Sequence, residues 1–217
     1  MKSAFRLLAL TLLAVAGGGG ACLLPYTPTP SMPAGPMASL DVGRTAAQLT
    51  GGMHGGHLAV AHKISAPFAL RLHGQFNTAA HNTFVSAGVG AGYAQRLTTE
   101  FPLHVGAALD GFFGKSWGPG IDTLGARAVF DLSAVWPNGS TTLVLPFVYT
   151  RAIQSHINAE QTWYGNALWL EPGLRLAVGS DPFRLVSHLG VSYPLYQQGE
   201  LGSAWPFLIG VGIQYVH

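Results

Sequence analysis

The sequence has few charged residues, a single cysteine and no long apolar run after its amino-terminal leader. Asp, Glu, Lys and Arg make up 9% of the 217 residues, whereas soluble proteins carry about 25%. This composition argues against an ordinary soluble domain. The interior has no stretch approaching the ~20 consecutive apolar residues of a membrane-spanning helix. The formal net charge of +2 offers no basis for nucleic-acid binding.

Glycine and apolar residues are abundant instead, with 29 glycines and 48% hydrophobic residues. High apolar content without helical spans is typical of a transmembrane β-barrel, whose signal is spread over many short alternating segments. We therefore predict an all-β fold: a single closed, antiparallel, up-and-down transmembrane barrel over residues 39–217.

The first 21 residues have the pattern of an export signal, with a positive end and a short apolar run from Leu7 to Val15. Two cleavage sites compete, one after Ala16 and one before Cys22. Gly20-Ala21-Cys22 resembles the end of a bacterial lipoprotein signal, and this resemblance implies acylation of Cys22. Cys22 has no possible disulfide partner within the chain because it is the only cysteine.

Residues 22–38 form a proline-rich segment. Its five prolines, between positions 25 and 36, disfavour both helix and sheet. We predict an extended tether between a lipid anchor at Cys22 and the barrel. A disordered end of the mature chain is the alternative.

Ten later segments alternate between apolar residues and polar or small ones. They are predicted as strands over residues 39–48, 57–64, 68–77, 84–97, 101–113, 123–136, 140–151, 167–178, 183–193 and 206–217. Short turns near residues 65, 99, 138 and 180 alternate with longer loops, as periplasmic turns and outer loops do in membrane barrels. An even strand count favours ten strands, and eight is the alternative.

The last segment is expected to close the barrel. From Phe207 to Tyr215 every second residue is apolar, and an early strand must return to pair with it. Residues 39–217 resemble the small outer-membrane barrels of Gram-negative bacteria, the class of the OmpA-type and OmpW-type barrels. Gly212, Tyr215 and His217 look like that class's terminal signal. The resemblance implies folding by the barrel assembly machinery into outer-membrane lipid.

The alternation assigns a set of charged residues to the lumen. A lumen of about eight to ten strands barely holds its own side chains, and buried charges need partners. We therefore predict a filling of ion pairs, with a narrow polar pore as the alternative. The set comprises Asp41, Lys63, Arg71, Arg96, Asp110, Arg127, Asp131, Glu171, Arg175 and Arg184, with His73, His104 and His188 beside them.

Other chemistry has weak signals. His54 and His57, in a glycine-rich segment, are candidates for an open copper or zinc site. Ser187 and His188 are adjacent, so they point to opposite faces of a strand and cannot form a catalytic pair. We predict no catalytic residue and no cofactor.

The predicted function is that of an outer-membrane barrel with a structural or protein-interaction role, contacting any protein partner through its long loops. A narrow channel for small polar solutes is one alternative. An outer-membrane lipid-modifying enzyme is the other.

Overall fold

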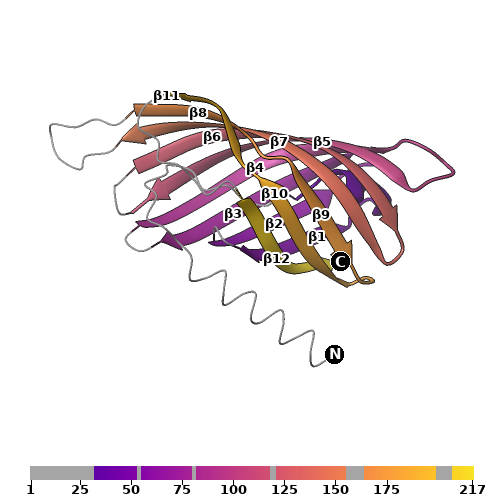
Figure 1. Cartoon of the computed structure of the whole chain (residues 1–217). Helices are drawn as coiled ribbons and strands as arrows, with labels where there is room; N and C mark the ends of the chain where they lie inside the picture. The colour runs from indigo at the N-terminus through magenta and orange to yellow at the C-terminus, as the bar shows by residue number, and fades with distance from the viewer. Residues whose placement is uncertain (1–31, 53–54, 80–81, 118–120, 155–163, 199–206) are drawn as a thin grey trace.

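The computed structural model describes residues 32–52, 55–79, 82–117, 121–154, 164–198 and 207–217. One short 3-10 helix, η1 (Gly35–Ser39), precedes twelve strands (Figure 1). The strands are β1 (Thr45–Gly52), β2 (Gly55–Lys63), β3 (Phe68–Ala79), β4 (Asn82–Arg96), β5 (Leu103–Ser116), β6 (Ile121–Trp136), β7 (Gly139–Gln154), β8 (Tyr164–Leu170), β9 (Gly173–Val178), β10 (Phe183–Val191), β11 (Tyr193–Gln198) and β12 (Phe207–Val216).

The twelve strands form a closed barrel of ten longer strands. β8 and β9 both pair with β7, β8 with its second half and β9 with its first half. Together they make one barrel strand interrupted at Glu171 and Pro172, since proline lacks the N–H that a sheet ladder needs. In the same way β11 continues β10 and pairs with β8, while β10 pairs with β9. The predicted all-β barrel with ten antiparallel strands is confirmed.

Closure occurs between the first and last strands, as predicted. β1 pairs with β12 from Ala46 opposite Val216 to Gly52 opposite Gly210. At the end of the seam, Thr45 and His217 exchange two backbone hydrogen bonds of 2.8 Å. Gly212 lies on this seam, and a Cβ there would collide with the Leu49 carbonyl oxygen. Glycine at this position therefore allows β12 to approach β1 closely.

The first strand begins later than predicted. Residues 39–48 were expected to be extended, but η1 occupies positions up to Ser39 and β1 begins at Thr45. Asp41 consequently lies in the turn before β1 and is exposed, so it is not a lumen residue. Thr45, the first residue of β1, bonds to the exposed His62 ring on the outside of the barrel at 2.9 Å.

The outward side chains form an apolar surface around the barrel. Large aliphatic residues in the middle of the strands stay exposed, with Leu72, Val89 and Leu109 each about 60% accessible. A continuous apolar band of this kind is the lipid-facing surface of a transmembrane barrel. Among the described residues, no helix has the length and apolarity to span a bilayer.

Aromatic residues gather near the short-turn end of this surface. Phe68 packs edge-on against Tyr93 at 5.4 Å, and Phe183 lies 5.1 Å from Tyr215. Such residues fit the aromatic girdle of a membrane interface. Trp169 does not belong to this girdle, because it is 3% exposed and lies in the lumen.

Candidate functional site: the filled lumen

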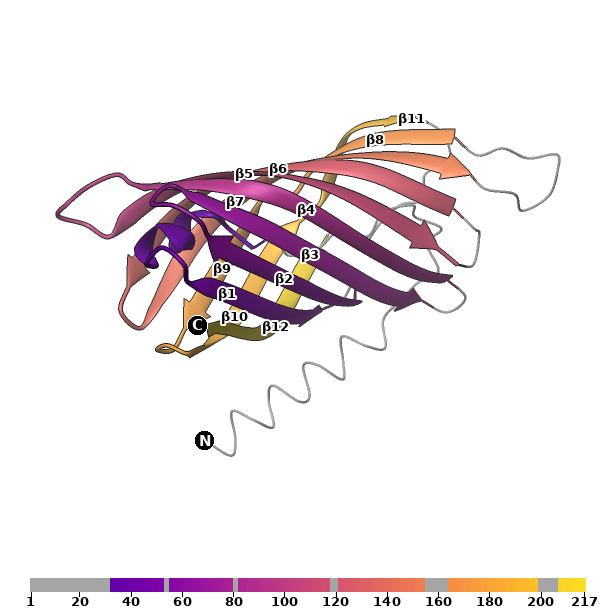
Figure 2. The same cartoon turned by 180° about the vertical axis from the view of Figure 1, so that it is seen from behind.

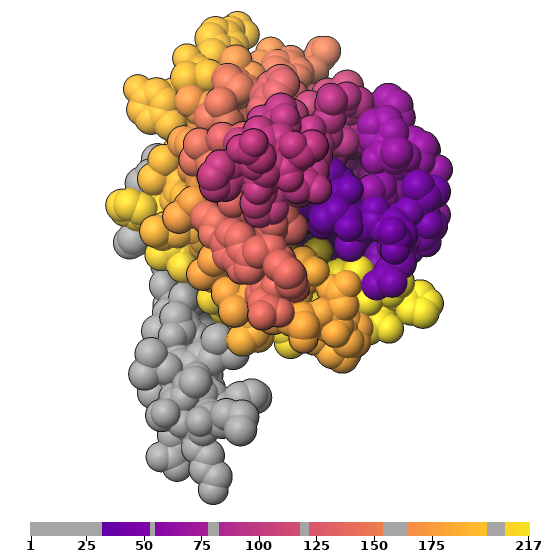
Figure 3. Space-filling model, turned by 90° about the vertical axis from the view of Figure 1, so that its right-hand side faces the viewer, coloured from indigo at the N-terminus to yellow at the C-terminus, as the bar shows by residue number. Residues whose placement is uncertain are grey.

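Residues 32–40, which we call the plug, lie inside the barrel. The carboxyl end of the plug lies at the short-turn rim, where the Lys63 ammonium donates hydrogen bonds to the carbonyl oxygens of Leu40 and, at 3.0 Å, Ala38. Its amino end lies deeper in the lumen, where the Met32 carbonyl oxygen accepts a 2.8 Å hydrogen bond from Arg71 Nη2. Figure 2 shows η1 enclosed by the strands of the barrel. Figure 3 shows the indigo atoms of the first described residues at the short-turn opening of the barrel.

Asp131 is the central anchor of the plug. Its two carboxylate oxygens accept hydrogen bonds from the backbone N–H groups of Ala34 and Gly35, each at 2.8 Å. The Ser133 hydroxyl donates a third, at 3.1 Å. Hydrogen bonds to a buried carboxylate are stronger than neutral ones. Side chains at Gly35 or Gly106 would collide with this carboxylate, so glycine at both positions makes the contact possible.

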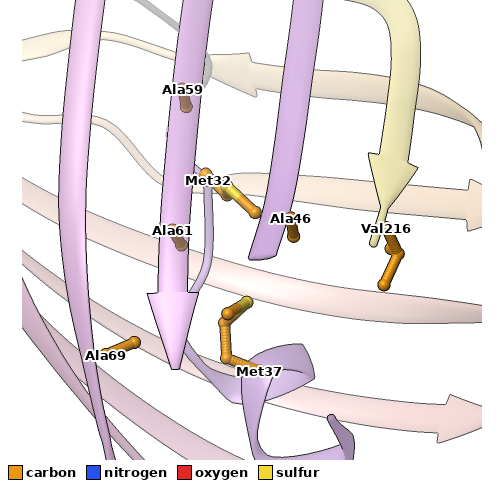
Figure 4. Packing of buried hydrophobic residues seen from close by; sticks show 7 residues of the cluster. All are labelled: Met32, Met37, Ala46, Ala59, Ala61, Ala69 and Val216. Carbon is orange, nitrogen blue, oxygen red and sulfur yellow. The ribbon is translucent and has the colours of Figure 1, made fainter. Parts of the chain in front are cut away.

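Small residues on the strands make room for the plug. Met32 and Met37 pack against alanines of β1, β2 and β3 and against Val216 of β12 (Figure 4). On the opposite wall Ala34 packs with four small residues of β4 to β7: Ala94, Ala108, Val129 and Val144. The plug therefore contacts strands around the barrel, as a segment inside the lumen must.

The plug corrects the predicted domain boundary. Residues 22–38 were expected to be an extended tether outside a barrel that begins at 39, but residues 32–38 lie within the lumen. The tether was predicted because the prolines favour an extended conformation. The sequence signal for a plug is the run of inward alanines and glycines on the strands, which leaves a space in the lumen that another segment must fill. Residues 22–31, with Cys22, lie outside the described residues.

The middle of the lumen is filled by polar and aromatic side chains. Arg71 Nη2 lies 3.1 Å from Asp110 Oδ2, and both side chains are almost fully buried. A side chain at Gly90 would collide with Asp110, so this glycine leaves room for the ion pair. The Arg127 guanidinium lies over the Phe112 ring, 5.9 Å from its centroid.

A second polar cluster surrounds Arg175 where β9, β1 and β12 face the lumen. Arg175 Nη2 donates hydrogen bonds to the side-chain oxygens of Gln48, at 2.8 Å, and Gln214, at 2.9 Å. These three residues are each 4% exposed or less. The cluster joins residues 127 positions apart in the sequence and ties β9 to the closing seam.

The structure places most of the predicted lumen charges inside. Eight of the ten are buried: Lys63, Arg71, Asp110, Arg127, Asp131, Glu171, Arg175 and Arg184. Asp41 lies in the turn before β1, as noted above. Arg96 is exposed at the rim, where it donates hydrogen bonds to the carbonyl oxygens of Thr98 and Thr99. It ends β4 and stabilises the turn, so it does not belong to the lumen.

The predicted metal and assembly residues fall in different places. His57 is not in a loop but in β2, with its ring buried 6.2 Å from that of His73; His54 lies outside the described residues. Within the ranges described above, no three His, Cys, Asp or Glu residues are arranged to hold a metal ion. Tyr215 faces outward, and His217 stacks on its ring at 6.2 Å.

Comparisons with known proteins add little. No protein-family model matches the chain, and no curated protein matches it. Among solved structures it is similar to the translocator domain of the autotransporter NalP from Neisseria meningitidis, at 12% identity and a TM-score of 0.38, over 99% of this chain and 95% of that chain. A likeness at this level carries no argument about the fold or the function. The fold is shown by the strand pairing around the closed barrel.

Proposed function

We propose that the protein is a non-conducting barrel of the bacterial outer membrane with a structural or protein-interaction role. The observation that carries this proposal is the plug, a segment of the same chain bonded inside the lumen by Lys63, Arg71 and Asp131. A barrel built to pass solutes would need a continuous polar path. Here that path is occupied by backbone and by methionine side chains.

The cavities beside the plug agree with a filled lumen. Two of those lined by described residues measure about 10 Å³ each, which is room for about one water molecule. One lies by Arg71 and His57, and the other by Arg175 and Arg184. A hydrated solute does not fit either space.

The proposed location follows from the surface and from the terminal strand. The apolar band suits outer-membrane lipid, and Gly212 and Tyr215 in the closing strand suit recognition by the barrel assembly machinery. We further propose that Cys22 is acylated. Replacing Cys22 with alanine should then remove a lipid-sized mass increment from the mature protein, whereas cleavage after Ala16 predicts no such increment.

The role is tested by planar-bilayer recording of the full chain. The proposal expects no steady unitary current. Steady currents that fall in Arg127→Gln and Arg175→Gln, but not in the exposed control Arg151→Gln, would contradict it and establish the narrow channel instead.

A further inference from the structure

Arg175 is a buried cation without a carboxylate partner. Its side chain is 1% exposed, and a guanidinium keeps its charge in proteins. Nη2 bonds to the amide oxygens of Gln48 and Gln214, which are neutral acceptors. Nε and Nη1 of Arg175 have no hydrogen-bond partner among the described residues. Over the part of the chain that the structure describes, no carboxylate lies within ion-pair distance of Arg175.

A second guanidinium lies at the same place. Arg184, on the neighbouring β10, is 8% exposed and sits opposite Gln214 in the sheet. Its Nη2 bonds to Asp181 at 2.8 Å, but Asp181 also contacts Arg44 at 3.5 Å and is 40% exposed. In the described part of the chain, Arg184 Nε has no hydrogen-bond partner. The unpaired groups of both arginines are therefore donors.

Arg175 and Arg184 line a small cavity between the barrel wall and the plug. Gln214 also lines it from the wall, and Met32, Pro33 and Met37 line it from the plug. The cavity is thus cationic on one side and apolar on the other. Its volume of about 10 Å³ matches one water-sized particle.

We propose that this cavity binds a single chloride-sized anion between Arg175 and Arg184. Burying a charge is costly unless it is paired and hydrogen-bonded, and an anion here supplies both the charge and the missing acceptor. A space of this size suits a single halide ion better than the larger sulfate, phosphate or carboxylate ions. Because the plug forms the apolar wall, anion binding and seating of the plug favour one another.

Crystallography of the full chain with bromide tests the site directly. Crystals grown in sodium bromide should show an anomalous scattering peak between the two guanidinium groups. An unoccupied cavity, or one that holds only water at saturating bromide, would overturn the proposal. This test does not depend on conductance, so its outcome is separable from that of the proposed function.

Unfolding in solution gives a second measurement. The folded protein should resist urea better in sodium chloride than in sodium gluconate of equal ionic strength. Above the dissociation constant, each tenfold rise in chloride should raise the folded-to-unfolded ratio about tenfold. Sulfate, which stabilises proteins without binding, should act equally on the wild type and the variants.

Arg175→Gln should lose the chloride dependence, and Arg184→Gln should weaken it. Arg151→Gln, which removes an exposed arginine outside the lumen, should keep it in full. If Arg175→Gln does not fold, the chloride dependence of Arg184→Gln and the bromide crystal structure still test the proposed site. Equal chloride dependence in Arg184→Gln and the wild type would contradict the proposed site.

Discussion

The two halves of the lumen are filled in different ways. Towards the short turns the strands point small residues inward, such as Ala46, Ala61, Ala94 and Ala108, and the plug occupies the space between them. Towards the long loops, Phe112 and Trp169 pack together with Val148 and Ala167, and the strands fill the lumen themselves. The size of the inward side chains thus decides where a barrel needs a second segment as its core.

Phe112→Ala should have the largest effect, because it removes the main filler of the long-loop half. Losing a buried phenylalanine costs about 3–5 kcal/mol through lost contacts and the cavity left behind. Urea unfolding in detergent measures this loss of stability. The matched control is Phe113→Ala, since Phe113 faces outward and is 50% exposed. Equal losses in both variants would show that the long-loop half does not depend on its own fillers.

Asp131→Ala should destabilise the short-turn half by about 3 kcal/mol, because two buried backbone N–H groups of the plug lose a charged acceptor. The same unfolding measurement applies. Asp122→Ala is the control, since the one ion pair of Asp122 within the described residues is with the exposed Lys115. A loss no greater than that of the control would mean that Asp131 does not hold the plug.

A disulfide between the plug and β4 should lock the plug in place. A Cβ at Gly92 would lie 3.3 Å from that of Ala34, slightly closer than the usual 3.5–4.5 Å of a disulfide. Ala34→Cys with Gly92→Cys, in a Cys22→Ser background, should therefore oxidise readily. It should stabilise the fold by about 2–4 kcal/mol, lost on reduction.

Mass analysis and unfolding with and without reductant check the disulfide. Gly92→Cys alone is the control for the added side chain, which also approaches Arg71. Failure to oxidise would contradict the position of the plug.

The smallest effect is expected at the exposed ion pair of Lys115 and Asp122, which lie 3.6 Å apart near the long loops. Lys115→Ala should change stability by less than about 1 kcal/mol, because such pairs are solvated. A larger loss would mean that the rim contributes to stability as the lumen does.

Sequence alternation predicted which residues face the lumen but not which contacts they make there. Arg71 and Asp110 were assigned to the lumen because an inward position repeats every second residue. That they form an ion pair depends on the register of β3, β4 and β5. Asp41 was misplaced because η1 and a turn precede the first strand, which begins only at Thr45, so Asp41 has no place in the alternation.

The sequence alone determined the ten-stranded plan, the lipid-facing surface and the polar character of the inner face, because these follow from a period of two within each strand. Only the tertiary structure decided that residues 32–40 fill the lumen, that Asp131 binds them, and that Arg175 meets Gln48 and Gln214. These contacts join residues far apart in the chain, and they exist only once the closing seam has set the register around the barrel.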